Sequence, residues 1–441
     1  MRGGGARTAV GRRRTAIGLP PRRRGARSVH VVTIPDSVGA SATARELGGV
    51  ELVARDPDVP HPPASNAKLL TAALALHHLG PDYRFETSVS RAGDSLALAG
   101  RGNPSLSPVE LSALAEGVGN AGIDAAARLV ADAGWFAGPS RGPGWTWEDG
   151  KYGYGAESTA LALAGNAVSV TVSGTDVEVT PETDAVELVA DFDRSADELR
   201  VYRDPRDGTI RVEGRPPDQP RTETVPVDDP VRHCLLAFRD ALADAGVTVS
   251  ENPRTPADAE TSAAGETIAT VRSPPVSELV REMNVPSDNF LAEQLARTVA
   301  REVRGEGSWE AWEDVVGEFL EERGAGGFRI RDGSGLSRYN LISSRGLVGV
   351  LEWAAERPWS ATFFDSLPAP GEGTLENRLL DADREVRAKT GTLTGSRTLS
   401  GIVRRDGERD VAFSILLSGL TGADEENARE TIDEFVRELA D

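Results

Sequence analysis

The chain has 441 residues, a formal net charge of −20 and a single cysteine, Cys234. Its length exceeds that of one small domain, and a hydrophobic share of 39% is enough for a buried core, which excludes a wholly disordered chain. One cysteine also excludes a disulfide framework within the chain and any zinc or iron–sulfur site built from several cysteines.

The basic residues are unevenly distributed. Arginine accounts for 46 of the 49, and nine arginines lie before residue 28, ahead of the first acidic residue, Asp36. The rest of the chain carries 40 basic and 69 acidic residues, a net charge of −29. Such an acidic body repels nucleic acid and anionic membranes, so we expect no nucleic-acid partner and regard an anionic membrane as a poor candidate. It suits a protein kept soluble in concentrated salt, and we hypothesise a halophilic source.

The N-terminal region is predicted to be irregular. Residues 1–28 are rich in glycine, arginine and alanine and show no apolar periodicity, so we expect a disordered basic arm. The arginines at 12–14 resemble the start of a twin-arginine export signal, but the apolar stretch after them is short, which favours a plain tail or a mis-called start over a leader. Eighteen apolar residues never occur in a row in this sequence, so we expect no membrane-spanning helix.

The predicted regular elements begin with short strands at 29–33 and 50–54 and a helix at 66–80 that ends at Gly80-Pro81. Between about residues 100 and 265 the sequence pattern differs from that on either side. Short apolar runs separated by Asp, Gly and Pro predominate there. The elements predicted there are a helix at 113–133, strands at 168–179, 186–191, 198–202 and 209–212, and a helix at 231–245.

The last third of the chain returns to longer elements. From about residue 266 we predict two helices separated by residues 285–288, then three strands and a closing helix at 421–440. The strands are predicted at 385–392, 398–404 and 411–417, with a hairpin turn at Asp406-Gly407. We therefore expect an α/β protein in which one domain, residues 29–100 and 266–441, carries an insertion at 101–265.

The three lysines, Lys68, Lys151 and Lys389, are informative because arginine replaces lysine almost everywhere else. A lysine can lose its proton at moderate pH, which an arginine cannot. Lys68 follows Ser65 by three residues at the start of a predicted helix, so the two side chains share one helix face. A desolvated lysine near a second cation can accept the serine proton, and the helix N-terminus offers backbone N–H groups to an oxyanion.

Lys389 opens the sequence Lys389-Thr390-Gly391-Thr392, which we predict to be a strand. Its cation and hydroxyl groups can bind a carboxylate, and Gly391 allows a second backbone to approach closely. Ser287-Asp288-Asn289 lies between the two lysine motifs, in a predicted loop between helices. The three motifs follow the order known from β-lactamases and penicillin-binding proteins.

Each motif also has a simpler interpretation. Ser65 and Lys68 alone would fit a helix-capping serine beside a solvated lysine, and Ser287 could cap the helix that begins at Asn289. We expect Ser287 to act both as a cap and in the chemistry, and Asp288 to be structural or exposed. Lys151 has no motif around it and is predicted to make a surface or interdomain contact. The aromatic cluster at 145–154 could line a cleft or form a packed loop.

Taken together, the sequence resembles the D-alanyl-D-alanine carboxypeptidase/endopeptidases called class C low-molecular-mass penicillin-binding proteins. The likeness covers roughly residues 48–441 and extends beyond the three motifs. The similar segments are 63–71, 100–106, 332–338, 371–375 and 388–395. One departure is Asn103, which stands where the family has an aspartate.

The resemblance implies a serine β-lactamase-like fold, with an antiparallel sheet, flanking helices and an inserted domain. The family is known for an insertion between its first two motifs that holds a nested β-rich domain. Here 219 positions separate Lys68 from Ser287, far more than a simple β-lactamase-like domain requires. The resemblance therefore places the inserted domain at 101–265, with a nested β-rich subdomain at about 166–227.

The resemblance also implies roles for the residues of the first two motifs. Ser65 would be the acylated nucleophile and Lys68 its general base. Ser287 would relay a proton to the leaving D-alanine, and Asn289 would contact the substrate amide. No metal and no organic cofactor is expected.

The third motif would bind the end of the substrate. Lys389 would supply positive potential, and the hydroxyl groups of Thr390 and Thr392 would hold the terminal carboxylate. Gly391 between them would allow the close backbone approach already noted. The backbone N–H groups of Ser65 and Thr392 would form the oxyanion hole.

We therefore expect a serine peptidase that cleaves a peptide ending in D-Ala–D-Ala through an acyl-enzyme and that binds β-lactams. One alternative is an esterase, amidase or β-lactamase that uses the same residues on another acyl substrate. A second is a non-catalytic relative that kept the fold, against which the intact motifs argue. Because the family works outside the cytoplasm, the resemblance implies an extracytoplasmic location, although this chain shows no convincing export signal.

Overall fold

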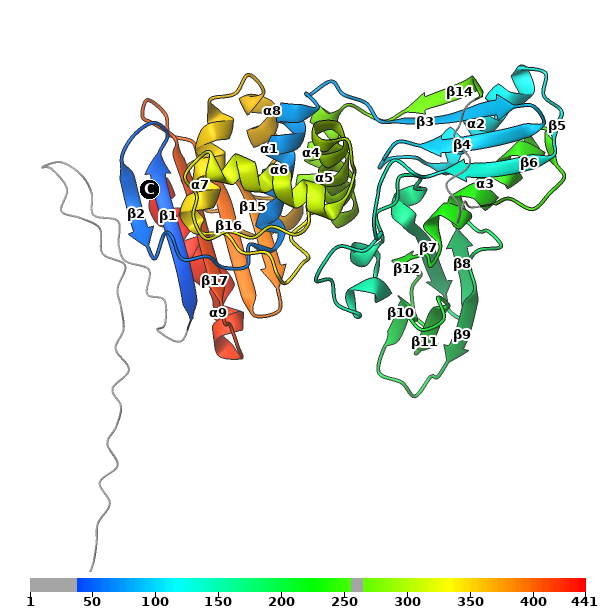
Figure 1. Cartoon of the computed structure of the whole chain (residues 1–441). Coiled ribbons are helices and arrows are strands. Elements are labelled where there is room, and N and C mark those ends of the chain that lie inside the picture. Colours follow the sequence, from blue (N-terminus) through cyan, green and yellow to red (C-terminus); the bar gives the residue numbers. More distant parts are fainter. Residues whose placement is uncertain (1–37, 255–264) are drawn as a thin grey trace, which may run out of the picture.

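The computed structural model describes residues 38–254 and 265–441, which form two lobes (Figure 1). Both ends of the described chain build the first lobe, residues 38–85 and 273–441, and its middle builds the second lobe, residues 86–254 and 265–272. The arm predicted at 1–28 and the strand predicted at 29–33 lie outside the described residues.

A five-stranded antiparallel sheet forms the centre of the first lobe, with the strand order β15-β16-β17-β1-β2. Its strands are β1 (Gly39–Glu46), β2 (Glu51–Arg55), β15 (Val386–Leu393), β16 (Ser396–Val403) and β17 (Val411–Ser418). Four of them match predicted strands, whereas β1 was not predicted. Its sequence, GASATARE, has little β propensity, and it becomes a strand because β17 and β2 pair with its two edges.

Helices cover both faces of this sheet. The face that contains Phe413 packs on Phe435 and Val436 of α9 (Ala423–Ala440), the predicted closing helix. The opposite face is covered by α1 (Lys68–His78), α4 (Val276–Asn284), α5 (Asn289–Arg304), α6 (Trp309–Glu321), α7 (Ser344–Ala355) and α8 (Ser360–Asp365). Burial on both faces explains why β17, VAFSILLS, has a nearly continuous apolar sequence.

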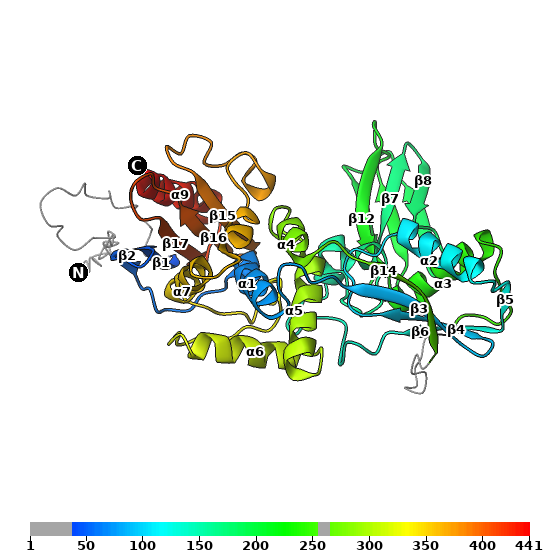
Figure 2. The same cartoon turned by 90° about the horizontal axis from the view of Figure 1, so that it is seen from above.

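The helix α1 runs through the middle of the first lobe (Figure 2), and residues 68–76 are all buried. Its sequence, KLLTAALALHH, is apolar around the whole circumference, as expected of a helix that is surrounded by others. Within the described ranges, no helix is both long and apolar enough to cross a bilayer.

The second lobe is built on a four-stranded sheet with the order β14-β3-β4-β6. Its strands are β3 (Glu86–Ala92), β4 (Ser95–Gly100), β6 (Arg128–Asp132) and β14 (Glu266–Arg272). Two helices, α2 (Pro108–Asn120) and α3 (Pro230–Asp244), share a hydrophobic cluster with this sheet. Cys234 lies in that cluster as a buried free thiol, and burial raises its pKa.

Two segments that we predicted as helical contain strands. The helix predicted at 113–133 ends at Asn120, and the chain continues through Gly122, at a φ of 75°, into β5 (Ala125–Ala126) and β6. The helical region predicted from 266 begins instead with β14. In the first place, pairing of β6 with β4 overrides the helical preference of the alanine-rich stretch around it. In the second, the sequence of β14, ETIATVR, is rich in β-branched residues and itself favours a strand, which pairs with β3.

The strand pairing also bears on the extent of the insertion. Residues 86–100 and 266–272, which we expected in the first lobe, form β3, β4 and β14 of the second-lobe sheet. We therefore propose that the insertion extends from Glu86 to Arg272.

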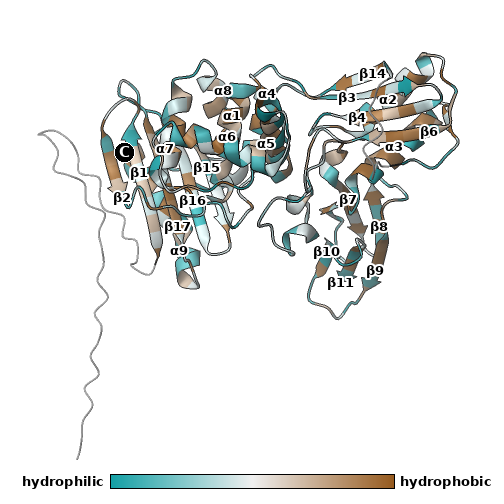
Figure 3. Ribbon diagram, viewed as in Figure 1, coloured by the Kyte–Doolittle hydropathy of each residue, from teal (hydrophilic) through white to brown (hydrophobic). Residues whose placement is uncertain are grey.

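The nested β-rich part consists of two three-stranded sheets, with the orders β10-β11-β9 and β12-β7-β8. Its strands are β7 (Ala167–Ser173), β8 (Asp176–Thr180), β9 (Leu188–Phe192), β10 (Leu199–Arg203), β11 (Ile210–Gly214) and β12 (Arg221–Pro226). Outside these two sheets, the short strand β13 (Thr248–Val249) pairs with β5. Apolar side chains of both sheets form one cluster, and apolar residues gather along the strands of both lobes (Figure 3). We propose residues 167–226 as a nested subdomain.

One arginine of α5 holds the two lobes together. The buried guanidinium of Arg297 donates hydrogen bonds to the backbone oxygens of Ser158 and Ala137 in the second lobe, at 2.7 and 2.8 Å, and to that of Gly307 in the first, at 3.0 Å. It also lies 4.8 Å from the ring centre of Trp309. A planar group with several donors suits this arrangement, in which three carbonyl groups converge.

Replacing Arg297 by methionine is expected to lower the free energy of unfolding by about 3 kcal/mol, because three buried carbonyl groups lose their donors. Denaturant unfolding of the full chain measures this change. Arg301→Met, the same substitution one turn later at a partly exposed residue, is the matched control and is expected to cost less than about 1 kcal/mol. Equal costs for the two variants would contradict the structural role assigned to Arg297.

Candidate active site

Ser65 lies in the short 3₁₀ turn η1 (Ala64–Ala67), which leads directly into α1. Its hydroxyl accepts a hydrogen bond from Nζ of Lys68, the first residue of α1, at 3.1 Å. The three-residue spacing therefore brings the two side chains into contact, as predicted. The backbone N–H of Ser65 is in a first helical turn, where amides lack intrahelical acceptors.

The amine of Lys68 is fully buried and has two further partners. It donates to Oδ1 of Asn289 at 2.6 Å and to the backbone oxygen of Ser334 at 2.9 Å. Three acceptors thus surround Nζ, one from the turn before α1, one from α5 and one from the loop that contains Ser334. The sequence motifs supplied two of these partners, and Ser334 lies in the segment 332–338 that the resemblance had pointed to.

Burial makes Lys68 a potential base. Desolvation lowers the pKa of its amine to about 8, although the negative charges of Glu293, Asp288 and Asp332 act in the opposite direction. An amine with this pKa is partly neutral near neutral pH, so it can accept the proton of the neighbouring serine hydroxyl.

The second motif lies between α4 and α5. Ser287 has a φ of 67°, in the left-handed region that few residues other than glycine adopt, and its side chain faces the cleft. Our expectation that Ser287 also caps α5 is wrong. Asp288 precedes the helix in an extended conformation and accepts the N–H of Leu291 at 2.8 Å, so it is the cap.

Asn289 links the two lobes at the site. Its Oδ1 accepts from Lys68, and its Nδ2 donates to the backbone oxygen of Tyr154 in the second lobe at 2.9 Å. The same side chain thus contacts the amine of Lys68 and the inserted second lobe.

The third motif lies on β15, the edge strand of the sheet. Lys389 is fully buried, and its Nζ donates to the backbone oxygen of Thr390 at 3.1 Å. Burial, and secondly the positive charge of Lys68, lower the pKa of Lys389 well below its usual value. Gly391 is required here, because a Cβ atom would lie 2.1 Å from Oγ1 of Thr398 and 2.7 Å from the backbone oxygen of Pro63.

The free edge of β15 faces the nucleophile side of the lobe. The N–H of Ala388 points away from β16, since it donates to the backbone oxygen of Pro368 at 3.1 Å. Amide directions alternate along a strand, so the N–H groups of Thr390 and Thr392 point to the same open edge. Thr392 is therefore placed to offer a backbone donor at the cleft.

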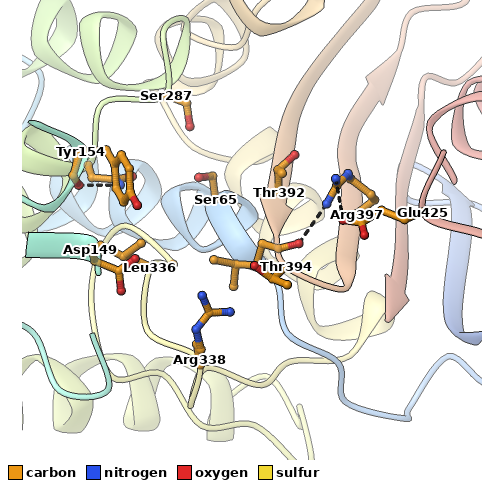
Figure 4. Close-up of a pocket in the computed structure, with 13 residues that line it drawn as sticks. Ser65, Asp149, Tyr154, Ser287, Leu336, Arg338, Thr392, Thr394, Arg397 and Glu425 are labelled. Carbon is orange, nitrogen blue, oxygen red and sulfur yellow. Dashed lines mark hydrogen bonds and ion pairs between the residues drawn. The ribbon is translucent and has the colours of Figure 1, made fainter. Parts of the chain in front are cut away.

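A cavity of about 410 Å³ joins the predicted residues (Figure 4). Ser65, Ser287, Asn289 and Thr392 line it, whereas the two lysines are buried behind its wall. Thr390 and Gly391 border a second cavity of about 330 Å³, which Thr392 also lines. Within the part of the chain that the structure describes, no three His, Cys, Asp or Glu side chains are arranged to hold a metal ion.

Several residues of the cleft were not predicted as site residues. Asp149 and Tyr154 enter it from the second lobe, and Leu336 and Arg338 enter from the loop that follows Ser334. The only sequence signal for the first two was the aromatic cluster, whose two interpretations both hold in part. Tyr154 lines the cleft, whereas Trp145 packs in the loop. Lys151 pairs with Glu148 at 2.7 Å and is not one of the residues that line the cleft.

The loop 332–338 is fixed by Asp332, whose carboxylate is fully buried. It accepts hydrogen bonds from the N–H groups of Gly335 and Ser337 and from the side chains of Asn340 and Trp145, at 2.6 to 2.9 Å. The network places Gly335 in close contact with the turn that carries the nucleophile. A Cβ atom at Gly335 would lie 1.8 Å from the backbone oxygen of Ala64.

Gly335→Ala is therefore expected to destabilise the fold by more than about 2 kcal/mol and to slow any chemistry at Ser65. Gly324→Ala is the matched control, because both glycines have positive φ, 87° and 67°, but a Cβ atom at Gly324 meets nothing within 4 Å. The control carries only the strain of a positive φ, about 1 kcal/mol. Thermal unfolding of both variants measures the difference, and similar melting temperatures would contradict the predicted clash.

Two other segments of the resemblance have structural positions. Gly373 and Thr374 support the loop before Ser287: the N–H of Thr374 donates to the backbone oxygen of Val285 at 3.2 Å, and Gly373 leaves no room there for a Cβ atom. Asn103, the residue that departs from the family pattern, lies in the second lobe, where its Oδ1 accepts from the N–H of Ser105 at 3.1 Å.

Comparisons with known proteins bear on the chain as a whole. The model of the D-Ala-D-Ala carboxypeptidase 3 (S13) family matches residues 34–439. A D-alanyl-D-alanine carboxypeptidase of Actinomadura sp. (strain R39) is 36% identical over 415 residues, which cover 85% of this chain and 76% of that protein. Carboxypeptidase DacB of Mycolicibacterium smegmatis is 30% identical over 397 residues, which cover 83% of this chain and 74% of that protein.

Among solved structures, penicillin binding protein 4 of Haemophilus influenzae has a similar fold, with a TM-score of 0.80 and 22% identity over 92% of this chain and 96% of that chain. The structure of that protein in complex with a β-lactam matches with a TM-score of 0.74 over the same shares of the two chains. At this identity, the likeness establishes the arrangement of the two lobes.

Proposed function

The chain belongs to the D-Ala-D-Ala carboxypeptidase 3 (S13) family, and we propose that it hydrolyses a D-alanyl peptide bond through an acyl-enzyme on Ser65. It is a serine-type D-Ala-D-Ala carboxypeptidase, and so a hydrolase and a penicillin-binding protein. The observation that carries the mechanism is the contact of 3.1 Å between the Ser65 hydroxyl and a buried amine at the wall of a cleft.

Acylation begins when the Ser65 hydroxyl attacks the carbonyl carbon of the penultimate D-alanine and gives its proton to neutral Lys68. The negative charge on the carbonyl oxygen is stabilised by the N–H groups of Ser65 and Thr392. When the C–N bond breaks, the proton passes through the hydroxyl of Ser287 to the leaving nitrogen. Water then attacks the ester and loses a proton to Lys68, and Ser65 regains its proton as the acyl group leaves.

The terminal carboxylate of the substrate would be held by the hydroxyl groups of Thr390 and Thr392, near the amine of Lys389. Each buried lysine disfavours a positive charge on the other. A bound carboxylate favours the charge on Lys389, which leaves Lys68 neutral and ready to act as the base. Substrate binding would in this way help to prepare the catalytic state.

The same site would react with β-lactams, whose strained amide takes the place of the D-Ala–D-Ala bond. The leaving nitrogen of a β-lactam stays attached to the acyl group through the opened ring, so the covalent complex persists. The β-lactam complex of the Haemophilus influenzae protein supports this part of the proposal, since that protein has a similar fold.

The proposal is tested by incubating the protein in high salt with an acylated peptide that ends in D-Ala–D-Ala and with its L-Ala–L-Ala counterpart. Release of D-alanine from the first peptide and no cleavage of the second are expected, and a fluorescent penicillin should label the protein and block the release. Rapid ester hydrolysis without release of D-alanine would favour the esterase alternative. A folded protein that neither takes label nor releases D-alanine would contradict both.

A further inference from the structure

We propose that Glu293 is a positioning residue for this reaction, because it holds the backbone oxygen of Ser334 against the amine of Lys68. The inference rests on the proposed function, which takes Lys68 as the base. Glu293 belongs to none of the three motifs, and it does not line the cleft.

The geometry starts from helix α5. Glu293 lies four residues after Asn289, so the two side chains share a helix face, the one that meets Lys68. The carboxylate of Glu293 is fully buried and accepts two adjacent backbone N–H groups, that of Gly333 at 2.8 Å and that of Ser334 at 2.9 Å. One carboxylate thus fixes two consecutive peptide units.

The other side of the same segment is held by α1. The backbone oxygen of Ser334 accepts from Lys68 at 2.9 Å, and that of Gly333 accepts from Oγ1 of Thr71 at 2.6 Å. The segment is therefore clamped between two helices, with its N–H groups on Glu293 and its oxygens on α1. If the carboxylate no longer held the N–H groups, the Ser334 oxygen would lose its fixed position beside Nζ of Lys68.

A carboxylate is the side chain that suits this position. Two N–H groups need two acceptor oxygens, and glutamine would offer only one, with its NH₂ group facing a donor. The neutral variant is therefore expected to lose one hydrogen bond and to disturb the Ser334 peptide without a large change of volume.

The charge of Glu293 also acts on the base. Lys68 faces three carboxylates, those of Glu293, Asp288 and Asp332, and the amine of Lys389 on β15. Among the carboxylates, Glu293 opposes the lowering of the pKa of Lys68 most strongly. Burial, and secondly the charge of Asp332, raise the pKa of Glu293, whereas its hydrogen bonds from Gly333 and Ser334 favour the ionised carboxylate; Arg297 lies near it on α5. Removal of this carboxylate should therefore lower the pKa of Lys68.

These effects give two separate readouts in one experiment. The acylation rate of the full-length protein by a fluorescent penicillin is measured from pH 5.5 to 10 for the parent and for Glu293→Gln. We expect the plateau rate to fall about tenfold, because a hydrogen bond that holds Ser334 is lost. We also expect the acid limb of the pH profile to move to lower pH by on the order of one unit, because an attractive charge is lost.

Thr71→Val is the matched control. It removes the hydrogen bond that holds Gly333 from the opposite side but leaves every charge in place. We expect its plateau rate to fall while its acid limb stays at the parental pH. A merely structural role for Glu293 would give that same pattern in Glu293→Gln and would overturn the proposal, as would a parental rate and profile.

If Glu293→Gln does not fold, Glu293→Asp decides the question. The shorter carboxylate keeps the charge but cannot reach both N–H groups, so we expect about tenfold slower acylation with the parental acid limb. A parental rate in this variant would overturn the proposal. Failure of the parent itself to take the label would count against the proposed function instead.

Discussion

Ser65→Ala is expected to abolish covalent labelling by penicillin and to reduce the release of D-alanine by at least about 10⁴-fold. The side chain that would carry the acyl group is then missing, and the cleft offers no replacement close to Lys68, whose other acceptors are an amide oxygen and a backbone oxygen. The measurement is mass spectrometry of the intact protein after incubation with penicillin. Thermal unfolding of the variant verifies that the fold is retained.

Ser287→Ala is the matched control for this loss, since it removes another serine hydroxyl from the same cleft. The nucleophile and its base stay in contact, so we expect labelling that is slower by roughly 10²-fold but complete in time. Undiminished labelling of Ser65→Ala would contradict the assignment of the nucleophile. Complete loss of labelling in Ser287→Ala and not in Ser65→Ala would exchange the two roles.

Lys68→Arg is expected to slow acylation by about 10³-fold, within the range that general bases contribute. A guanidinium stays protonated at any usable pH, so it cannot accept the serine proton, and it is too large for a site with three acceptors within 3.1 Å. In the parent, the rate should rise with pH up to the pKa of Lys68, about 8, because only the neutral amine is a base. The variant should lack this rise.

Lys151→Arg provides the control for this substitution. Lys151 is a lysine outside the cleft, paired with Glu148 at 2.7 Å, and arginine can keep that ion pair. We expect the parental rate and the parental pH profile. A flat pH profile in the parent, or an unchanged rate in Lys68→Arg, would show that another group acts as the base.

The residues that the structure brings together at the candidate site could be named in advance because they occur in short motifs; their roles remain a prediction. The spacing of Ser65 and Lys68 fixes their contact through helix geometry alone. The strand that carries Lys389 was predicted at 385–392, close to its observed bounds of Val386–Leu393. The contacts among the three motifs depend on tertiary structure, and only the resemblance to a known family brought them together in advance.

The residues that sequence reasoning missed act through backbone groups or through distant loops. Glu293 looks like any glutamate on a helix, and its role depends on two N–H groups about 40 positions away. The strand β1 has a sequence rich in alanine and small residues whose local preference is not extended, and it forms because neighbouring strands pair with it. Such features depend on partners that a single sequence does not identify.

The side chain of Asn289 couples the relative position of the two lobes to the orientation of the base. Its Oδ1 accepts from the base in one lobe and its Nδ2 donates to the backbone oxygen of Tyr154 in the other, so separation of the lobes would break one of these two hydrogen bonds. A movement of the lobes that widened the cleft to admit a bulky polymer would therefore disturb the side chain that orients the Lys68 amine. Cleavage would then occur only while the two lobes are closed, and Ser65 would not be acylated in a molecule whose cleft is widened.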